Sequence, residues 1–341
     1  MKRSELSAIF LLPMLVAACG EDDAGYAPVE ENAIRFTALA GHEARSNEVT
    51  TNTLTEFNVF AYTDGQLYMD DVKVSKDADN TWTYSPVMYW PTTPVNFFAY
   101  SPAQWLEGIS NVNQTVTYDN DGNTDLIYAV NMNEEQSTSP VKLNFRHAMC
   151  HVEVELMSTT PSIAVSVSGI KLAGINKTGT FKFPQMTTAP GVATSAGVWS
   201  GLTALSEYTY YDGSTSPTVL TSTATGFSDS CSGFLLPQNL TAMTSDTGGY
   251  SGSYICVDCV INDKATGALL WPNGNTPPQQ VVTDGDKKTG RLFFSLSNSD
   301  LTHWNDGYRY VYRITINNAE GMEPIDFDPS VEIFTEKTSL L

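Results

Sequence analysis

Apolar and polar residues alternate in short runs along most of the chain. Residues 34–38 read Ile-Arg-Phe-Thr-Ala, and residues 163–167 read Ile-Ala-Val-Ser-Val. A two-residue period is typical of a strand with one buried face. Stretches rich in Gly, Pro, Thr, Ser, Asn and Asp separate these runs, and long segments with helical periodicity are hard to find. The pattern therefore predicts an all-β protein built from many short strands.

The runs fall into two groups, which indicates two β-domains. The chain has 341 residues, and the roughly 320 that remain without the N-terminal signal suit two domains or one large β-domain. The sequence Met-Ser-Thr-Thr-Pro-Ser at residues 157–162 interrupts the strands, so we expect domains at residues 34–160 and 161–341. Residues 184–230, rich in Thr, Ser, Gly and Ala, are expected to form long loops. The predicted strands are 34–38, 57–62, 82–84, 87–91, 95–102, 125–129, 141–145, 152–156, 163–167, 179–183, 234–238, 254–261 and 308–316.

Two amphipathic patterns lie near the C-terminal end. In residues 308–316, every second residue from Tyr308 to Ile316 is Tyr or Ile, so these side chains share one face. In residues 325–333, the apolar side chains Ile325, Phe327, Val331 and Ile333 fall on one parity, and Asp, Ser and Glu fall on the other. Both segments are therefore predicted to be strands with one apolar face.

The N-terminal segment has the features of an export signal. Lys2 and Arg3 precede an apolar run at residues 6–18, which is shorter than the roughly 20 residues needed to span a bilayer. Small residues and Cys19 follow, as in bacterial lipoproteins. We therefore predict a signal peptide at residues 1–18, lipidation of Cys19 and an acidic tether at residues 19–33. An uncleaved anchor, or a signal cut elsewhere, is the alternative.

The charge balance narrows the range of partners. The formal net charge of the chain is −20, and removing a signal with Lys2, Arg3 and Glu5 (net +1) gives −20 − 1 = −21. Phosphate binding needs clustered Lys and Arg, so nucleic acid is excluded as an expected partner. The composition fits an acidic, exported protein.

Four cysteines follow Cys19, at positions 150, 231, 256 and 259. An oxidising location permits disulfides, but their connectivity cannot be read from a sequence. Cys256 and Cys259 have the CxxC spacing of metal and redox sites, yet no second CxxC exists and the flanking residues predict a strand. We expect buried small side chains rather than a metal centre, with a disulfide left open.

Histidines and carboxylates offer two further candidate metal sites. His147 and His151 would share one face of a strand at a separation of about 13 Å, too far to bind one metal ion. Residues 119–125 contain three aspartates and a glycine, which suit calcium but equally suit an ordinary turn. No metal is therefore assigned.

Motifs of known enzymes are weak in this chain. Residues 168–171 match SxxK and residues 288–290 match KTG, as in serine β-lactamases, but Ser168 lies in a predicted strand rather than at the start of a helix. No GxSxG or HExxH motif occurs. We therefore predict a protein that is not an enzyme and needs no cofactor.

Several short motifs, taken in order, carry a resemblance to a known family. They are residues 34–38 followed by Arg45, residues 57–62, 89–91, 97–102, 125–129, 145–148, 235–238 and 307–310, and residues 331–333. Together, and behind a lipoprotein-type cysteine, they resemble the fimbrillin family, the subunits of type V pili of Bacteroidales, and their fimbrillin-like relatives. The matching pieces extend over most of the chain after the signal.

The resemblance implies a fold and an assembly mechanism. It implies two tandem transthyretin-like β-sandwich domains. It also implies that a lipidated precursor reaches the surface, where a trypsin-like protease cuts after a basic residue and removes the first strand. The open groove then accepts a strand from another subunit, because an apolar groove with unpaired backbone groups favours strand addition.

The resemblance directs attention to two segments. Arg45 lies in a polar stretch after the first predicted strand and is the favoured processing site, because proteases cut exposed polar loops. Arg35 is the second choice, and a surface arginine without a processing role is the alternative for Arg45. The favoured donor strand carries Ile325, Phe327, Val331 and Ile333, and an ordinary final strand is its alternative.

The sequence thus predicts a surface-exported lipoprotein pilin, a stalk or tip subunit that contributes to cell adhesion. Its expected location is the outer membrane, through a palmitate-type lipid on Cys19, and the fimbrium. Its expected partners are other pilin subunits, a trypsin-like protease and a host protein or glycan receptor. The alternative is a non-polymerising surface adhesin or glycan-binding lipoprotein, with Trp105, Trp199 or Trp304 stacking on sugars.

Overall fold

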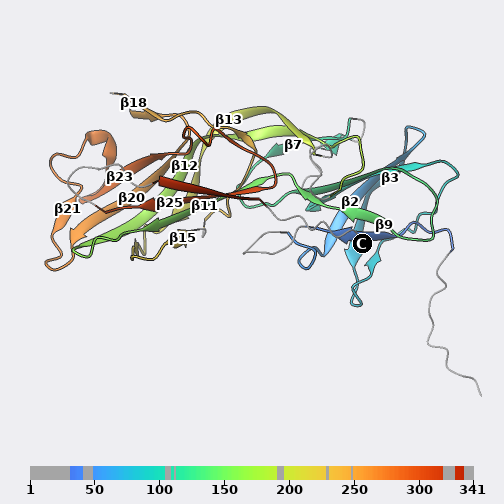
Figure 1. Cartoon of the computed structure of the whole chain (residues 1–341), viewed down its shortest axis with the longest axis horizontal. Coiled ribbons are helices and arrows are strands. Elements are labelled where there is room, and N and C mark those ends of the chain that lie inside the picture. Colours follow the sequence, from blue (N-terminus) through green and yellow to red (C-terminus); the bar gives the residue numbers. More distant parts are fainter. Residues whose placement is uncertain are drawn as a thin grey trace, which may run out of the picture.

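The computed structural model describes residues 31–40, 49–103, 109–110, 113–189, 196–227, 230–246, 249–317 and 327–333. The described chain is elongated, with one group of sheets at each end (Figure 1). It contains no α-helix among these residues, and η3 (Pro278–Gln280) is a short 3₁₀ turn. No helix of the described residues is long and apolar enough to cross a membrane. The prediction of an all-β protein is confirmed.

The N-terminal sheets enclose their own apolar core. A six-stranded sheet has the order β10-β8-β5-β2-β3-β4, and a separate pair, β1 and β9, is parallel. The core between them contains Phe36, Phe57, Phe97 and Phe145, all buried. The strands are β1 (Phe36–Leu39), β2 (Glu56–Thr63), β3 (Gln66–Lys76), β4 (Trp82–Thr83), β5 (Val95–Ser101), β8 (Ile127–Glu134), β9 (Val141–Asn144) and β10 (Arg146–His147).

Two larger sheets form the C-terminal part. One has the order β22-β23-β20-β12-β7-β6, with β13, β14 and β21 attached, and the other has the order β15-β11-β25-β26, with β16 attached. Apolar residues of both sheets, such as Val154, Ile170 and Tyr312, share one core.

The first of these sheets contains β6 (Ile109–Ser110), β7 (Thr115–Asp119), β12 (Ile163–Lys182), β13 (Val198–Asp212), β14 (Thr218–Val219), β20 (Tyr254–Asp263), β21 (Leu269–Trp271), β22 (Val281–Asp284) and β23 (Lys287–Ser295). The second contains β11 (Cys150–Met157), β15 (Thr225–Phe227), β16 (Phe234–Leu235), β25 (Tyr308–Thr315) and β26 (Phe327–Ile333). Two small pairs complete the set: β17 (Gln238–Asn239) with β24 (His303–Trp304), and β18 (Thr244–Asp246) with β19 (Gly249–Ser251).

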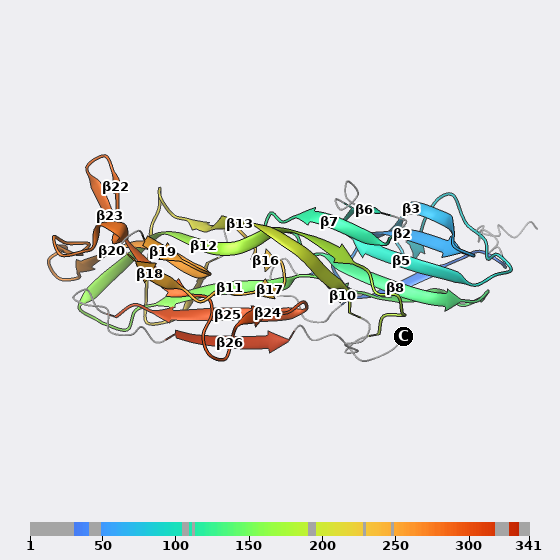
Figure 2. The ribbon, with the colours of Figure 1, turned by 90° about the horizontal axis from the view of Figure 1, so that it is seen from above.

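A third apolar cluster joins the two parts. It combines the outer face of the six-stranded sheet, with Phe60, Phe98 and Tyr128, and the end of β12, with Phe181 and Phe183. The long strands β12 and β13 extend from the C-terminal sheets toward the N-terminal ones (Figure 2). The two parts are therefore held together by a packed interface as well as by the covalent chain.

Several strand predictions need correction. The predicted strands 163–167 and 179–183 are parts of the single 20-residue strand β12. The 15-residue strand β13 lies inside the predicted loop region 184–230. Residues 87–91 form only an isolated bridge between Tyr89 and Ala33. β11, which precedes the predicted domain boundary at 160/161, pairs with β25 and so joins the C-terminal sheets. The boundary itself stays a prediction.

Candidate functional site

The first candidate site is strand β1 and the groove that it fills. Ile34, Phe36, Ala38 and Ala40 are 1–6% exposed and pack into the N-terminal core. The ring of Phe36 lies 5.6 Å, between ring centroids, from the ring of Phe97. The residues between them are intermediate or exposed, so the predicted alternation of residues 34–38 is confirmed. The strand therefore contributes one row of apolar side chains to a groove made by other strands.

The backbone of β1 is paired along one side. Phe36 to Leu39 pair in parallel with Val141 to Asn144 of β9. Beyond the strand, the N–H of Ile34 donates to the carbonyl oxygen of Met88 at 2.8 Å. No second strand pairs with β1 among the described residues. Its attachment thus depends mainly on apolar burial and one ladder.

The ends of the segment that contains Arg45 are fixed to the fold, although Arg45 itself lies outside the described residues. Before the segment, the Ala40 N–H donates to Thr51 Oγ1 at 3.0 Å. After it, the Val49 N–H donates to Asp125 Oδ2 at 2.8 Å. The assignment of Arg45 as a processing site stays a prediction, as does lipidation of Cys19, which also lies outside the described residues.

A buried contact between Asp125 and His147 supports the second of these anchors. Asp125 Oδ1 lies 3.0 Å from His147 Nδ1, and both side chains are at most 3% exposed. A buried carboxylate is costly unless its oxygens have partners, and here both oxygens do. Asp125 therefore joins the chain after the Arg45 segment to strand β10.

Arg35, the second choice for cleavage, sits at the border of β1. Its guanidinium donates to the carbonyl oxygen of Thr138, and its carbonyl accepts from the Val141 N–H at 2.7 Å. A protease needs an extended, unpaired segment, so this pairing disfavours cleavage there.

The second candidate site is the C-terminal strand β26. It pairs antiparallel with β25, and Phe327, Val331 and Ile333 lie opposite Ile314, Tyr310 and Tyr308. Ile325 lies outside the described residues. β26 is the last strand of its sheet, and Pro329 within it fits an edge position, because proline cannot donate to a second ladder. The described chain thus presents the favoured donor as an edge strand, paired within its own molecule.

The strand beneath it, β25, is anchored on its inner face. Tyr310, Tyr312 and Ile314 are buried, as predicted from the period of residues 308–316. The Tyr312 hydroxyl donates to the Leu296 carbonyl at 2.9 Å and lies 2.8 Å from Trp304 Nε1, which donates to it. Burial raises the pKa of the Tyr310 hydroxyl to about 12. These contacts bind β25 to the core and do not involve β26.

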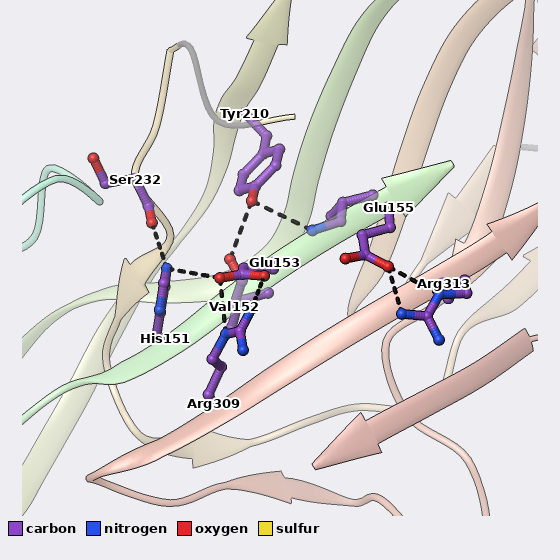
Figure 3. Close-up of polar contacts among 9 residues, drawn as sticks. His151, Val152, Glu153, Glu155, Tyr210, Ser232, Arg309 and Arg313 are labelled. Carbon is purple, nitrogen blue, oxygen red and sulfur yellow. Dashed lines mark hydrogen bonds and ion pairs between the residues drawn. The ribbon is translucent and has the colours of Figure 1, made fainter. Parts of the chain in front are cut away.

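Ion pairs hold the outer face of β25 to β11 (Figure 3). Arg309 Nε donates to Glu153 Oε1 at 2.8 Å, and its Nη2 donates to the other carboxylate oxygen. Arg313 donates to Glu155 Oε2 from Nε at 2.9 Å and from Nη2 at 2.6 Å. Two neighbouring parallel strands are thereby joined by two Arg–Glu pairs.

Further contacts hold strand β11 next to these ion pairs. His151 Nε2 lies 3.0 Å from the Ser232 carbonyl oxygen, and the ring stacks on Phe234. On the opposite face, the Tyr210 hydroxyl donates to the Val152 carbonyl at 3.2 Å. Sequence reasoning missed the Arg–Glu pairs: Glu153 and Glu155 alternate with valines, but nothing in the sequence shows that β11 lies beside β25.

The candidate metal groups are separated in space. His147 contacts Asp125, whereas His151 contacts Ser232. Cys256 and Cys259 lie on one strand at opposite parity, so their side chains leave opposite faces of the sheet. All four cysteines of the described residues are free and buried, and burial raises the pKa of the Cys231 thiol to about 11. No group of three metal-ligating side chains gathers within the described part of the chain.

The aspartate-rich turn and the tryptophans have structural contacts. Asp121 Oδ1 accepts from the backbone N–H groups of Asn123 and Thr124, which is a turn geometry. Trp304 is 2% exposed, so the alternative in which it stacks on sugars at the surface is wrong for this residue. Trp199 is partly buried and donates to the Ala148 carbonyl, and Trp105 lies outside the described residues.

Comparison with known proteins gives a consistent result. The chain matches the model of the fimbrillin-like family over residues 44–332. Among solved structures, it is similar to a fimbrial protein from Bacteroides vulgatus, with 16% identity, a TM-score of 0.51 and coverage of 89% of this chain and 100% of that one. A candidate cell adhesion protein from Bacteroides uniformis matches with 14% identity, a TM-score of 0.49 and coverage of 90% and 99%. No curated protein matches significantly.

Proposed function

Because the chain belongs to the fimbrillin-like family, we propose that it is a surface-exported lipoprotein pilin, a stalk or tip subunit that contributes to cell adhesion. It carries its lipid on Cys19, is anchored to the outer membrane and enters the fimbrium. Its two parts act as tandem transthyretin-like sandwiches. It has no enzymatic role and assembles by strand exchange after a trypsin-like protease cuts at Arg45.

The alternating burial of β1 is the observation that carries this proposal. Removing β1 together with the preceding Ile34 would expose a groove lined by Phe57, Phe97 and Phe145. Burial of each large apolar side chain stabilises by about 1.5–3 kcal/mol. An empty groove of this kind favours a replacement strand with the same alternation, which restores both the apolar contacts and the backbone ladder.

The segment 325–333 supplies a replacement with the required pattern. Ile325, Phe327, Val331 and Ile333 share one parity, as the buried residues of β1 do. Donation requires β26 to leave β25, where it is paired along seven residues. The Arg309–Glu153 and Arg313–Glu155 pairs would keep β25 on β11 during this step, so that the loss of β26 does not unravel the sheet.

Limited trypsin digestion of the soluble form, residues 20–341, tests the processing step. We expect one main cut after Arg45, seen by intact mass, and no such cut in Arg45→Ala. Arg35→Ala is the matched control, and it should leave the cut unchanged, because Arg35 is held in backbone pairing. A cut abolished by Arg35→Ala instead would reassign the site. A resistant, persistently monomeric protein would favour the non-polymerising adhesin or glycan-binding lipoprotein.

A further inference from the structure

An open hollow of about 380 Å³ lies on the outer face of the six-stranded sheet, beside the hairpin that joins β2 and β3. Its floor is formed by Tyr62 of β2, Phe98 of β5 and Met132 of β8, three strands that are neighbours in that sheet. Its polar lining includes the amides of Asn96, Gln114 and Gln185. Small-ligand pockets measure about 300–1,000 Å³ and combine apolar walls with a few polar groups. The hollow falls in this range.

The hollow exists because only part of this sheet face is covered. Phe183, at the end of β12, packs on Phe98 with 6.1 Å between ring centroids. Tyr62 packs on the other side of Phe98 at 5.8 Å, in a T-shaped arrangement. The chain then turns after Phe183, and the apolar face around Tyr62 and Met132 stays open at the hollow. The aromatic floor is thus a continuation of the interface that joins the two parts of the molecule.

The wall of the hollow is fixed in place. The segment that carries Gln185 is bound to β8, because the Met132 N–H donates to Thr187 Oγ1 at 3.1 Å and the Thr188 N–H donates to the Val130 carbonyl at 2.7 Å. On the opposite side, the Gln114 amide hydrogen-bonds the Tyr62 hydroxyl. A site whose groups are already positioned loses less conformational entropy on binding.

Two of the amides have unused hydrogen-bonding capacity. Asn96 Oδ1 accepts from the Asn133 N–H at 2.8 Å, which fixes the amide, and its Nδ2 donates to no partner among the described residues. Gln185 Nε2 makes two long contacts of 3.4 Å to the carbonyls of Phe183 and Pro184, and its Oε1 accepts from no group in the described part of the chain. The hollow therefore offers both a donor and an acceptor.

The lining decides the class of ligand. None of the described residues that line the hollow is charged, so the lining itself supplies no counter-charge, although the Asp70 carboxylate outside it acts on the Tyr62 hydroxyl. The net charge of −20 further disfavours an anionic ligand. A wholly apolar ligand would leave the amides unpaired, which costs free energy. A neutral molecule with hydroxyl groups and one apolar face satisfies every part of the lining.

We propose that this hollow binds a neutral saccharide unit. The C–H face of a sugar ring packs on Tyr62 and Phe98, because the face of an aromatic ring carries partial negative charge. Its hydroxyl groups both donate and accept, as the free Asn96 and Gln185 groups require. The site shares no residue with β1 or β26, so it does not depend on strand exchange.

The test uses uncut, monomeric protein of residues 20–341 on an array of neutral oligosaccharides, with sialylated and sulfated versions of the same glycans alongside. We expect binding to neutral glycans and weaker binding to the anionic versions. The affinity for the best neutral glycan, measured by calorimetry, should fall about tenfold or more in the double variant Asn96→Ala/Gln185→Ala, because two hydrogen bonds are lost.

The control is Asn275→Ala, which removes an exposed amide in the C-terminal part and should leave the affinity unchanged. Circular dichroism and thermal melting establish that the double variant is folded. Tyr62→Ala, which removes part of the floor, should also weaken binding. Absence of binding to any neutral glycan, preference for anionic glycans, or equal affinity of the double variant and the wild type would each overturn the proposal.

Discussion

At the scale of single residues, Asp125 shows how one buried carboxylate can fix a functional segment. Its two oxygens bind His147 Nδ1 and the Val49 N–H, and its burial excludes water from both contacts. The contact with Val49 lies at the C-terminal end of the segment that contains Arg45. The residue therefore ties the position of that segment to the core of the N-terminal sheets.

We predict that Asp125→Ala lowers the free energy of unfolding by about 2–4 kcal/mol. The change removes the carboxylate oxygens that contact His147 Nδ1 and the Val49 N–H, and the loss of each such hydrogen-bond partner costs about 1–3 kcal/mol. Urea denaturation followed by tryptophan fluorescence measures the loss. Asp121→Ala, in the same turn but exposed, is the control and should cost about 1 kcal/mol or less. Equal losses in the two variants would contradict this role for Asp125.

At the scale of elements, period-two patterns located most strands but not their lengths. β12 reads as two strands because its buried parity changes along the chain: Val165 and Val167 are odd-numbered, and Ile170 and Leu172 are even-numbered. A register shift against β20 between Val167 and Gly169 accounts for the first change. A prediction based on a two-residue period therefore loses track of the buried face across such a bulge.

A second change of phase requires glycine. Gly174 has a φ of +68°, and a Cβ there would lie 1.8 Å from the Gly252 carbonyl oxygen. The register of β12 with β13 shifts at this point, between Ala173 and Ile175. The sequence shows a glycine between apolar residues, but it does not show that another backbone approaches so closely. β13, whose register is shifted three times, was missed for the same reason.

The candidate sites show the same difference between local patterns, which a sequence reveals, and long-range pairing, which it does not. The alternation of residues 34–38 follows from burial of one face, so it could be predicted. In residues 308–316 the buried Tyr and Ile positions could be predicted too, but the burial of Arg309 and Val311 on the other face could not. The Arg309–Glu153 pair joins residues 156 positions apart, and the parallel pairing of β11 with β25 that allows it depends on the whole fold. Long-range pairing of this kind leaves no local signal.

The two Arg–Glu pairs allow a matched test on one strand. Arg309→Ala should lower the free energy of unfolding by about 1.5–3 kcal/mol, because its side chain is 8% exposed and its loss leaves the partly buried Glu153 with only the longer contact to His151 Nε2 at 3.7 Å. Arg313→Ala should cost about 1 kcal/mol or less, because its side chain is 41% exposed and solvent screens the pair. Chemical denaturation measures both. Equal costs, or a larger cost for Arg313→Ala, would contradict the account.

At the scale of the whole molecule, two of the three apolar clusters contain buried tyrosines, and these set the response to alkaline pH. Burial raises the pKa of Tyr128, in the cluster that joins the two parts, to about 12. It raises the pKa of Tyr310, in the C-terminal core, to a similar value. Both groups have an ordinary pKa of 10.0. The folded state therefore retains protons that the unfolded state releases.

The sign of the pH dependence follows from these shifts. Below pH 10 these tyrosines are protonated in both the folded and the unfolded state, and the stabilisation is fully present. Between about pH 10 and 12 they ionise only in the unfolded state, so the free energy of unfolding falls as pH rises. Each such tyrosine contributes a slope of about 1.4 kcal/mol per pH unit. Denaturation at a series of pH values, with tyrosinate absorbance, measures the slope. Tyr128→Phe should give a shallower slope, and unchanged stability from pH 9 to 12 would refute the assignment.

Electron microscopy of trypsin-treated protein, with uncut protein of residues 20–341 as reference, tests the central claim most directly. If assembly proceeds by strand exchange, removal of residues up to Arg45 converts monomers into fibres, with ladders on a denaturing gel, while the uncut protein stays monomeric. Protein that loses the β1 strand and remains monomeric, or fibres that form with β1 still present, would contradict assembly by strand exchange.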